Sequence, residues 1–160
     1  MDTELQLEEK RFVEEVSIAF EQMNMPRMAG RIVGRLMISD PPYQSTDALA
    51  EALMASRGSI STMSRFLIQF NLIERFSLPG VRQDYFRVKP DAWHQLVRQR
   101  THQITTLRRL AEHGLRLMGD REHANRLWLE ETRDMYAFFE REFPALVERW
   151  EEEHKLAGYP

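Results

Sequence analysis

The chain has 160 residues, of which 42% are hydrophobic and 29% charged, and its net charge is −3. This length allows one domain with a substantial core, or a compact domain with helical extensions. The absence of cysteine excludes disulfides, thiol catalysis and thiolate metal sites. No apolar run reaches the roughly 18 residues of a membrane span, and the acidic N-terminus lacks the apolar core of a signal peptide, so we expect a cytoplasmic protein.

Two helices are predicted in the first quarter of the chain. Apolar residues recur at helical spacing over residues 3–23, with most acidic residues elsewhere on the helix. Pro26 suits the first turn of a second helix that runs to about Ser39. Within it, Gly30 and Gly34 lie four residues apart, although glycine costs a helix about 1 kcal/mol relative to alanine. These two glycines predict a close approach by another helix or backbone segment.

Two shorter helices follow the segment "SDPPYQS", where proline ends the second helix. Ser45 or Thr46 is predicted to cap the third helix. Gly58, in "SRGS", is expected to supply a left-handed backbone conformation for a tight turn. A fourth helix is then predicted from about Ser59 to Phe70.

A short β-hairpin and long helices complete the chain. The runs "IERFS" and "DYFRV" alternate with a period of two, and Pro79-Gly80 between them is a turn signal. Beyond Pro90 the pattern is helical. We expect one helix over residues 91–118, a second over 120–142, and a last one that Pro144 starts and that ends near 154.

The fourth helix has two opposite faces at about 100° per residue. Its core face is formed by Ile60, Met63, Leu67 and Phe70. Its other face carries short polar side chains, a guanidinium and an amide, from Ser61, Thr62, Arg65 and Gln69. Arginine can bind guanine with two hydrogen bonds and glutamine can bind adenine, while a helix N-terminus favours phosphate. The alternative is that Ser59 only caps the helix and the other polar side chains only face water.

A short helix, a turn, a polar helix and a hairpin form the pattern of a winged helix-turn-helix. The predicted tip of the wing carries Arg82 and Gln83, with Arg87 further along the second strand, which suits a contact with the DNA backbone or minor groove. Charge supports this interpretation, because residues 26–90 have a net charge of +4, whereas residues 1–25 have −5 and residues 91–160 have −2.

Three segments carry a family resemblance: "MPRMAGRIVGRLMISDPP", "STDALAEALMASRGSISTMSRFLIQFNLIERF" and "LPGVRQDYFRV". Over about residues 24–100 the chain resembles the GbsR-type branch of the MarR-like winged-helix transcriptional regulators. The resemblance implies a homodimer that binds a double-stranded DNA operator and responds to a small ligand. It assigns DNA contacts in the recognition helix to Ser59, Ser61, Thr62 and Arg65, places Arg57 in the preceding turn, and assigns the wing tip to Arg82 and Gln83.

Three parts are expected: an N-terminal dimerisation helix (1–23), a winged helix-turn-helix (24–90) and a helical region for dimerisation and a possible effector site (91–160). The last part has more apolar residues than a domain of its size needs for its own core, and spare apolar stripes on long helices are usually buried against a partner. The alternative is that these helices fold back on the DNA-binding domain. Together the expected elements predict a mainly α-helical fold with a small β-hairpin wing.

Other kinds of site have little support. The five histidines form no pair with metal-ligand spacing, no glycine loop for phosphate is present, and no nucleophile stands with a base. We therefore expect no enzyme activity, no metal and no cofactor. Aromatic residues of the C-terminal region can line an effector pocket, or simply form core or dimer interface: Trp93, Trp128, Tyr136, Phe138, Phe139 and Trp150.

The sequence thus predicts a transcriptional regulator, with repression as its most plausible action. A second hypothesis stays open, in which the winged helix docks protein and never binds DNA.

Overall fold

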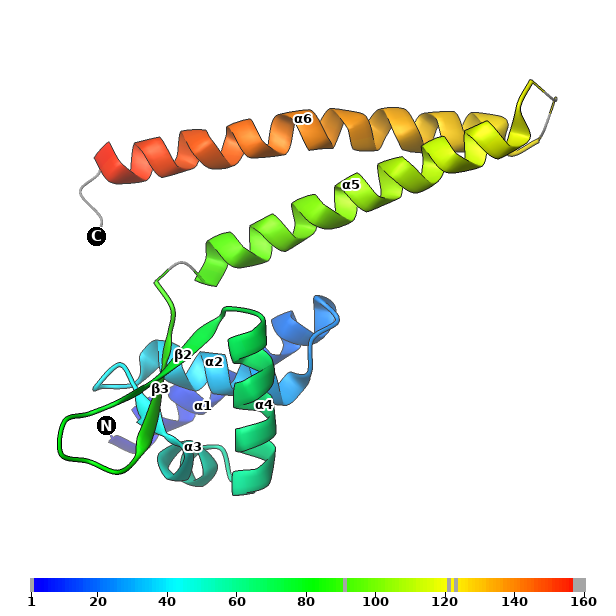
Figure 1. Cartoon of the computed structure of the whole chain (residues 1–160). Helices are drawn as coiled ribbons and strands as arrows, with labels where there is room; N and C mark the ends of the chain where they lie inside the picture. The colour runs from blue at the N-terminus through cyan, green and yellow to red at the C-terminus, as the bar shows by residue number, and fades with distance from the viewer. Residues whose placement is uncertain (1, 91, 121, 123, 157–160) are drawn as a thin grey trace. The chain divides into compact units, whose positions relative to one another are not determined.

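The computed structural model describes residues 2–90, 92–120, 122 and 124–156 (Figure 1). In chain order these residues form α1 (Asp2–Gln22), α2 (Arg27–Ile38), β1 (Gln44–Ser45), α3 (Thr46–Ala52), α4 (Arg57–Gln69), β2 (Ile73–Ser77), β3 (Asp84–Val88), α5 (Ala92–Met118) and α6 (Arg126–Leu156). The predicted fold class, mainly helical with a small β wing, is confirmed. The chain divides into two compact units, Met1–Gln95 and Leu96–Pro160, and each is described by itself.

Helices α1 and α2 pack closely against each other, as the two glycines of α2 predict. A Cβ atom on Gly30 would lie 2.7 Å from the Cα of Ser17, and one on Gly34 would lie 3.2 Å from the Cα of Val13. Phe20 of α1 is 1% exposed and Ile32 of α2 is fully buried. Helix α1 therefore belongs to the core of the first unit, whatever further role it has in dimerisation.

The sheet has three antiparallel strands in the order β1-β3-β2. Strands β2 and β3 are the predicted hairpin, with Arg75 opposite Phe86 and Phe76 opposite Tyr85. Strand β1 was not predicted from the sequence, because two residues close to a proline pair carry no periodic signal. The strand leads directly into α3. Its second residue, Ser45, is the N-cap of that helix and accepts a hydrogen bond from the backbone N–H of Ala48.

Helices α5 and α6 form an antiparallel hairpin in the second unit (Figure 1). Thr105 of α5 donates a 2.8 Å hydrogen bond to Glu140 of α6, and Arg108 donates a second one to the same carboxylate. Near the other end of the hairpin, a Cβ on Gly114 would lie 2.9 Å from Leu129. Ile104 and Ala111 are the buried apolar residues of α5 within this unit.

The prediction of two helices over 120–142 and 144–154 was wrong. One helix, α6, begins at Arg126 and contains Pro144 in its interior. An interior proline removes a backbone hydrogen bond and normally breaks a helix. Here α6 continues through Pro144, and half-buried apolar residues recur at helical spacing on both sides of it, at Phe139, Phe143 and Val147. This continuous apolar stripe favours one helix over two. Among the described residues, no helix combines the length and apolar character needed to cross a membrane.

Candidate nucleic-acid interface

Helix α4 begins at Arg57, two residues before the predicted start. Its N-cap is Ser56, whose hydroxyl accepts a 3.1 Å hydrogen bond from the backbone N–H of Ser59. Gly58 therefore lies in the first helical turn, and the expectation that it supplies a left-handed turn was wrong. Met54 takes that conformation, with φ of +49°. The hydroxyl of Ser56 explains the earlier start, because it accepts a hydrogen bond from a free N–H of the first turn. Hydrophobic periodicity does not reveal such a cap.

One face of α4 is buried and the other is exposed, as predicted. Ile60, Ser64 and Leu67 are buried. The exposed polar face, as we call it from here on, consists of Arg57, Ser61, Thr62, Arg65 and Gln69. Ser59 is half-buried at the helix start, which leaves it less accessible than the other predicted contact residues. The short side chains between the two guanidinium groups and the amide leave room for the edge of a base or a phosphate.

The wing is braced by polar contacts along its two strands. Asp84 of β3 accepts hydrogen bonds from Arg75 at 3.4 Å and from Ser77 at 3.3 Å, both on β2. Arg87 donates a 2.6 Å hydrogen bond to Glu74 and lies over the ring of Phe76. Arg87 is therefore engaged within the wing itself.

The wing tip, the loop between β2 and β3, holds the two predicted contact residues. Arg82 is exposed, and Gln83 is half-buried beside the start of β3. The two are thus placed on the loop as expected, with Arg82 the more accessible of the pair.

The basic charge of residues 26–90 is partly neutralised by α1, which the sequence analysis did not foresee. Glu14 of α1 lies 3.3 Å from Arg27 and 2.7 Å from Arg31, and Glu9 lies 2.9 Å from Arg35. The net charge of a sequence window therefore overstates the charge that this surface offers to a polyanion.

Two arginines stand apart from these ion pairs. Within the part of the chain that the structure describes, Arg65 and Arg82 have no carboxylate partner; Arg65 only donates a 3.4 Å hydrogen bond to the backbone carbonyl of Ser61 in its own helix. By contrast, Arg57 is paired with Asp47 at 2.6 Å. Among the described arginines of the first unit, the two without a carboxylate partner are thus located on the polar face and on the wing tip. No cluster of three potential metal ligands occurs among the described residues.

Comparison with known proteins identifies the family. The model of the MmpR5-like MarR family of transcriptional regulators matches residues 91–153. The chain is 43% identical over 129 residues to the HTH-type transcriptional regulator MmpR5 of Mycobacterium tuberculosis, an alignment that covers 81% of this chain and 78% of that protein. It is 27% identical over 89 residues to the putative HTH-type transcriptional regulator YvaV of Bacillus subtilis, covering 56% of this chain and 50% of that one.

A solved structure agrees with this assignment. The crystal structure of a transcriptional regulator superposes with a TM-score of 0.73 at 39% identity, covering 91% of this chain and 99% of the other. These relatives are regulators and not enzymes, which confirms that expectation. The winged helix-turn-helix, the identity and the coverage together show that the chain belongs to the MmpR5-like MarR family of transcriptional regulators.

Proposed function

We propose that the protein is a homodimeric, sequence-specific repressor that binds an operator with α4 as its recognition helix and the β2–β3 wing beside it. The observation that carries the proposal is the location on those two elements of Arg65 and Arg82, the two arginines of the first unit that have no carboxylate partner among the described residues. Phosphate and base acceptors attract guanidinium groups that no carboxylate neutralises. The exposed polar face of α4 and Gln83 complete the proposed contact set, with Ser59 at its margin.

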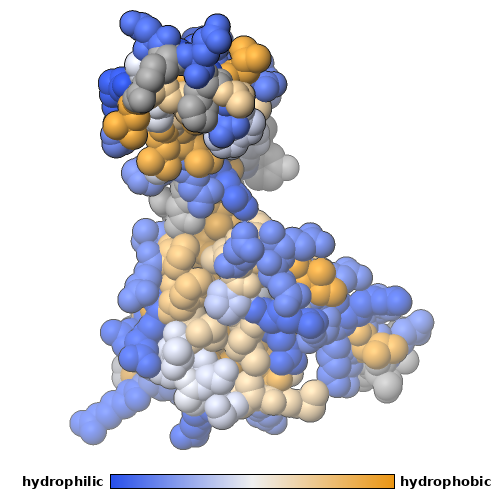
Figure 2. All heavy atoms as spheres, turned by 90° about the vertical axis from the view of Figure 1, so that its right-hand side faces the viewer, coloured by the Kyte–Doolittle hydropathy of each residue, from blue (hydrophilic) through white to orange (hydrophobic). Residues whose placement is uncertain are grey.

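The proposed dimer is supported by the second unit. Leu110, Leu117 and Leu127 are 59%, 68% and 77% exposed, and Trp128 is 66% exposed. Figure 2, which faces the end of the α5–α6 hairpin, shows hydrophobic side chains among hydrophilic ones there. Long helices that expose this many large apolar residues are usually covered by a partner. Two-fold symmetry would place the two recognition helices about 34 Å apart, one turn of DNA.

The branch of the family, the sign of the regulation and its control by a ligand are proposed from the sequence alone. The segments between about residues 24 and 100 support placement in the GbsR-type branch, and the same resemblance supports repression and control by a small ligand. Because a repressor acts on the chromosome, we also propose a cytoplasmic location.

The test is binding of the purified protein to the intergenic DNA beside its own gene, followed by fluorescence anisotropy against salt and random competitor DNA. Specific binding with a two-fold footprint, and an affinity that falls steeply as salt increases, supports the proposal. Analytical ultracentrifugation of the same samples checks the dimer.

The second candidate function is a winged-helix module that docks a protein. Its supporting observation is the neutralisation of Arg27, Arg31 and Arg35 by α1, which lowers the positive charge of the unit. Binding that is equally weak for the intergenic and the random DNA at low salt would favour this module over the repressor.

A further inference from the structure

Two hydroxyl groups on the exposed polar face of α4 are left without a hydrogen bond. The hydroxyls of Ser61 and Thr62 are exposed and have no hydrogen-bond partner within the part of the chain that the structure describes. Other exposed hydroxyls are engaged: that of Ser56 caps α4, that of Ser77 donates to a carboxylate, and that of Thr106 donates to its own helix. A free, exposed hydroxyl is accessible to an enzyme that modifies side chains.

Ser61 lies between two arginines of the same helix. Arg57 is four residues before it and Arg65 four residues after it, so the three side chains share one side of α4. The Nε of Arg65 donates a 3.4 Å hydrogen bond to the backbone carbonyl of Ser61, which places this guanidinium beside the serine. Thr62 has only Arg65 at contact spacing, because Arg57 is five residues away. An anionic group added at Ser61 would therefore meet two cations.

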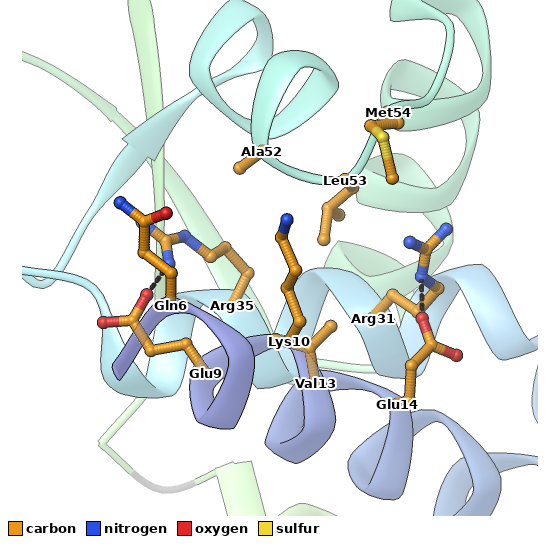
Figure 3. A pocket seen from close by; sticks show the side chains of 10 residues that line it. All are labelled: Gln6, Glu9, Lys10, Val13, Glu14, Arg31, Arg35, Ala52, Leu53 and Met54. Carbon is orange, nitrogen blue, oxygen red and sulfur yellow. Dashed lines mark hydrogen bonds and ion pairs between the residues drawn. The ribbon is translucent and has the colours of Figure 1, made fainter. Parts of the chain in front are cut away.

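Both arginines can take a new anionic partner. Arg65 has no carboxylate partner among the described residues, and the pair of Arg57 with Asp47 is exposed and therefore weak. By contrast, the half-buried Arg31 of α2 is already paired with Glu14 of α1 at 2.7 Å (Figure 3). A phosphate monoester carries a charge of about −1.5 to −2 and three acceptor oxygens, and guanidinium groups bind it with paired hydrogen bonds. The chemistry around Ser61 thus fits a phosphate on its hydroxyl.

We propose that Ser61 is a phosphorylation site, at which a serine/threonine protein kinase weakens DNA binding by placing a phosphate between Arg57 and Arg65. In this reaction Oγ of Ser61 attacks the γ-phosphorus of ATP and the bond from that phosphorus to the β–γ bridging oxygen breaks. ADP leaves, and the hydroxyl proton passes to the catalytic base of the kinase. The phosphate then occupies two guanidinium groups of the proposed contact set and repels the DNA phosphates. The effect on DNA rests on the proposed function, whereas phosphorylation and its pairing with the arginines do not.

The site is tested by incubating the purified protein with γ-³²P-labelled ATP and an extract of the cells that produce it naturally. Ser61→Ala should lose most of the label that the wild type incorporates, whereas Thr62→Ala, the matched control on the same face, should keep it. Trypsin cleaves after Arg57 and Arg65, so tandem mass spectrometry of the peptide 58–65 locates the phosphate. No label in the wild type, or equal label in all three proteins, would overturn the site.

The pairing is tested without DNA, on full-length protein into which phosphoserine is incorporated at position 61 during translation. A ³¹P NMR titration gives the second pKa of the phosphate. We expect this pKa to be lower than in the same protein unfolded in urea, because the two guanidinium groups stabilise the dianion. Arg65→Gln should raise it part of the way back, and Arg11→Gln, which removes an exposed arginine of α1, should leave it unchanged. Equal pKa values in the folded and unfolded protein would overturn the pairing.

The effect on DNA is tested by fluorescence anisotropy with intergenic DNA and the same phosphorylated protein. Its affinity should be roughly hundredfold lower than that of the unphosphorylated protein at low salt, and the difference should shrink as salt increases. If the unphosphorylated protein binds specifically and phosphorylation leaves its affinity unchanged, the control of DNA binding is overturned and the phosphorylation site stands. Failure of the unphosphorylated protein to bind DNA counts against the repressor alone, because the labelling and the NMR titration do not depend on DNA.

Discussion

The Nε of Arg57, the first residue of α4, lies 2.6 Å from Oδ1 of Asp47 in the first turn of α3. The two side chains are 74% and 50% exposed, and exposed ion pairs of this kind contribute only about 0–1 kcal/mol to stability. A DNA phosphate can therefore replace the carboxylate at little cost. In the proposed DNA complex Asp47 would compete with a phosphate for Arg57, whereas Arg65 has no such competitor among the described residues.

Asp47→Asn should tighten DNA binding by roughly two- to fivefold at low salt, because it frees Arg57 and removes a negative charge near the phosphates. The measurement is fluorescence anisotropy with intergenic DNA. Glu51→Gln, on the same helix, removes an equal charge from an exposed residue and is the matched control. In an Arg57→Gln background the gain from Asp47→Asn should disappear; a gain of the same size in both backgrounds would show that the pair is irrelevant to binding.

Arg65→Ala should weaken specific DNA binding by about 1–3 kcal/mol, because its guanidinium lies on the exposed polar face and is expected to contact a base edge. Affinity for random DNA should fall much less. Arg82→Gln, at the wing tip, is the informative comparison: loss of a phosphate contact weakens specific and random binding alike and lowers the salt slope by about one. Circular dichroism and sedimentation should show both variants folded and dimeric. Identical effects of the two substitutions would remove the distinction between base and phosphate contacts.

Two glycine-to-alanine substitutions should have opposite effects on stability. In Gly30→Ala the new Cβ would lie 2.7 Å from the Cα of Ser17, a backbone atom, so we expect a loss of about 1–3 kcal/mol from overpacking. In Gly58→Ala the new Cβ would lie 3.9 Å from the hydroxyl oxygen of Ser56, in an exposed first helical turn. Alanine should therefore gain up to about 1 kcal/mol there. Urea denaturation of both variants checks the signs, and a stabilised Gly30→Ala would mean that α1 is not fixed against α2.

The sequence predicted those parts of the fold that depend on local periodicity. The two strands of the hairpin, the cap at Ser45, the polar face of α4 and the close approach at Gly30 are all where the residues indicated. These features are encoded within a few neighbouring residues, since each depends on side-chain spacing or on one cap. The same holds for the exposure of Arg65 and Gln69.

The features that the sequence did not predict depend on contacts between distant segments. Arg35 is neutralised by Glu9, which lies 26 positions earlier, and Arg31 by Glu14 of the same helix α1. Neither partner can be chosen from spacing alone. The left-handed conformation of Met54 was not predicted, because glycine tolerates this conformation best and Gly58 lies nearby. Gly58 is instead inside α4, since the hydrogen bond from the backbone N–H of Ser59 to the hydroxyl of Ser56 caps the helix before it.

Ionisation of Glu140 should make the stability of the α5–α6 hairpin depend on pH. The hydrogen bond from Arg108, and after it the one from Thr105, lowers the pKa of Glu140 below its usual value. A carboxylate with a lowered pKa in the folded state stabilises that state above its unfolded pKa, and this contribution is lost as the pH falls through the folded pKa. Glu140→Gln should therefore lower the Tm at neutral pH and have progressively less effect in acid. Glu131→Gln, an exposed carboxylate on the same helix, should leave the pH profile unchanged. Thermal unfolding followed by circular dichroism from neutral pH to about pH 3 gives the comparison; a deficit that is constant over this range would mean that Glu140 stabilises the hairpin by packing and not by its charge.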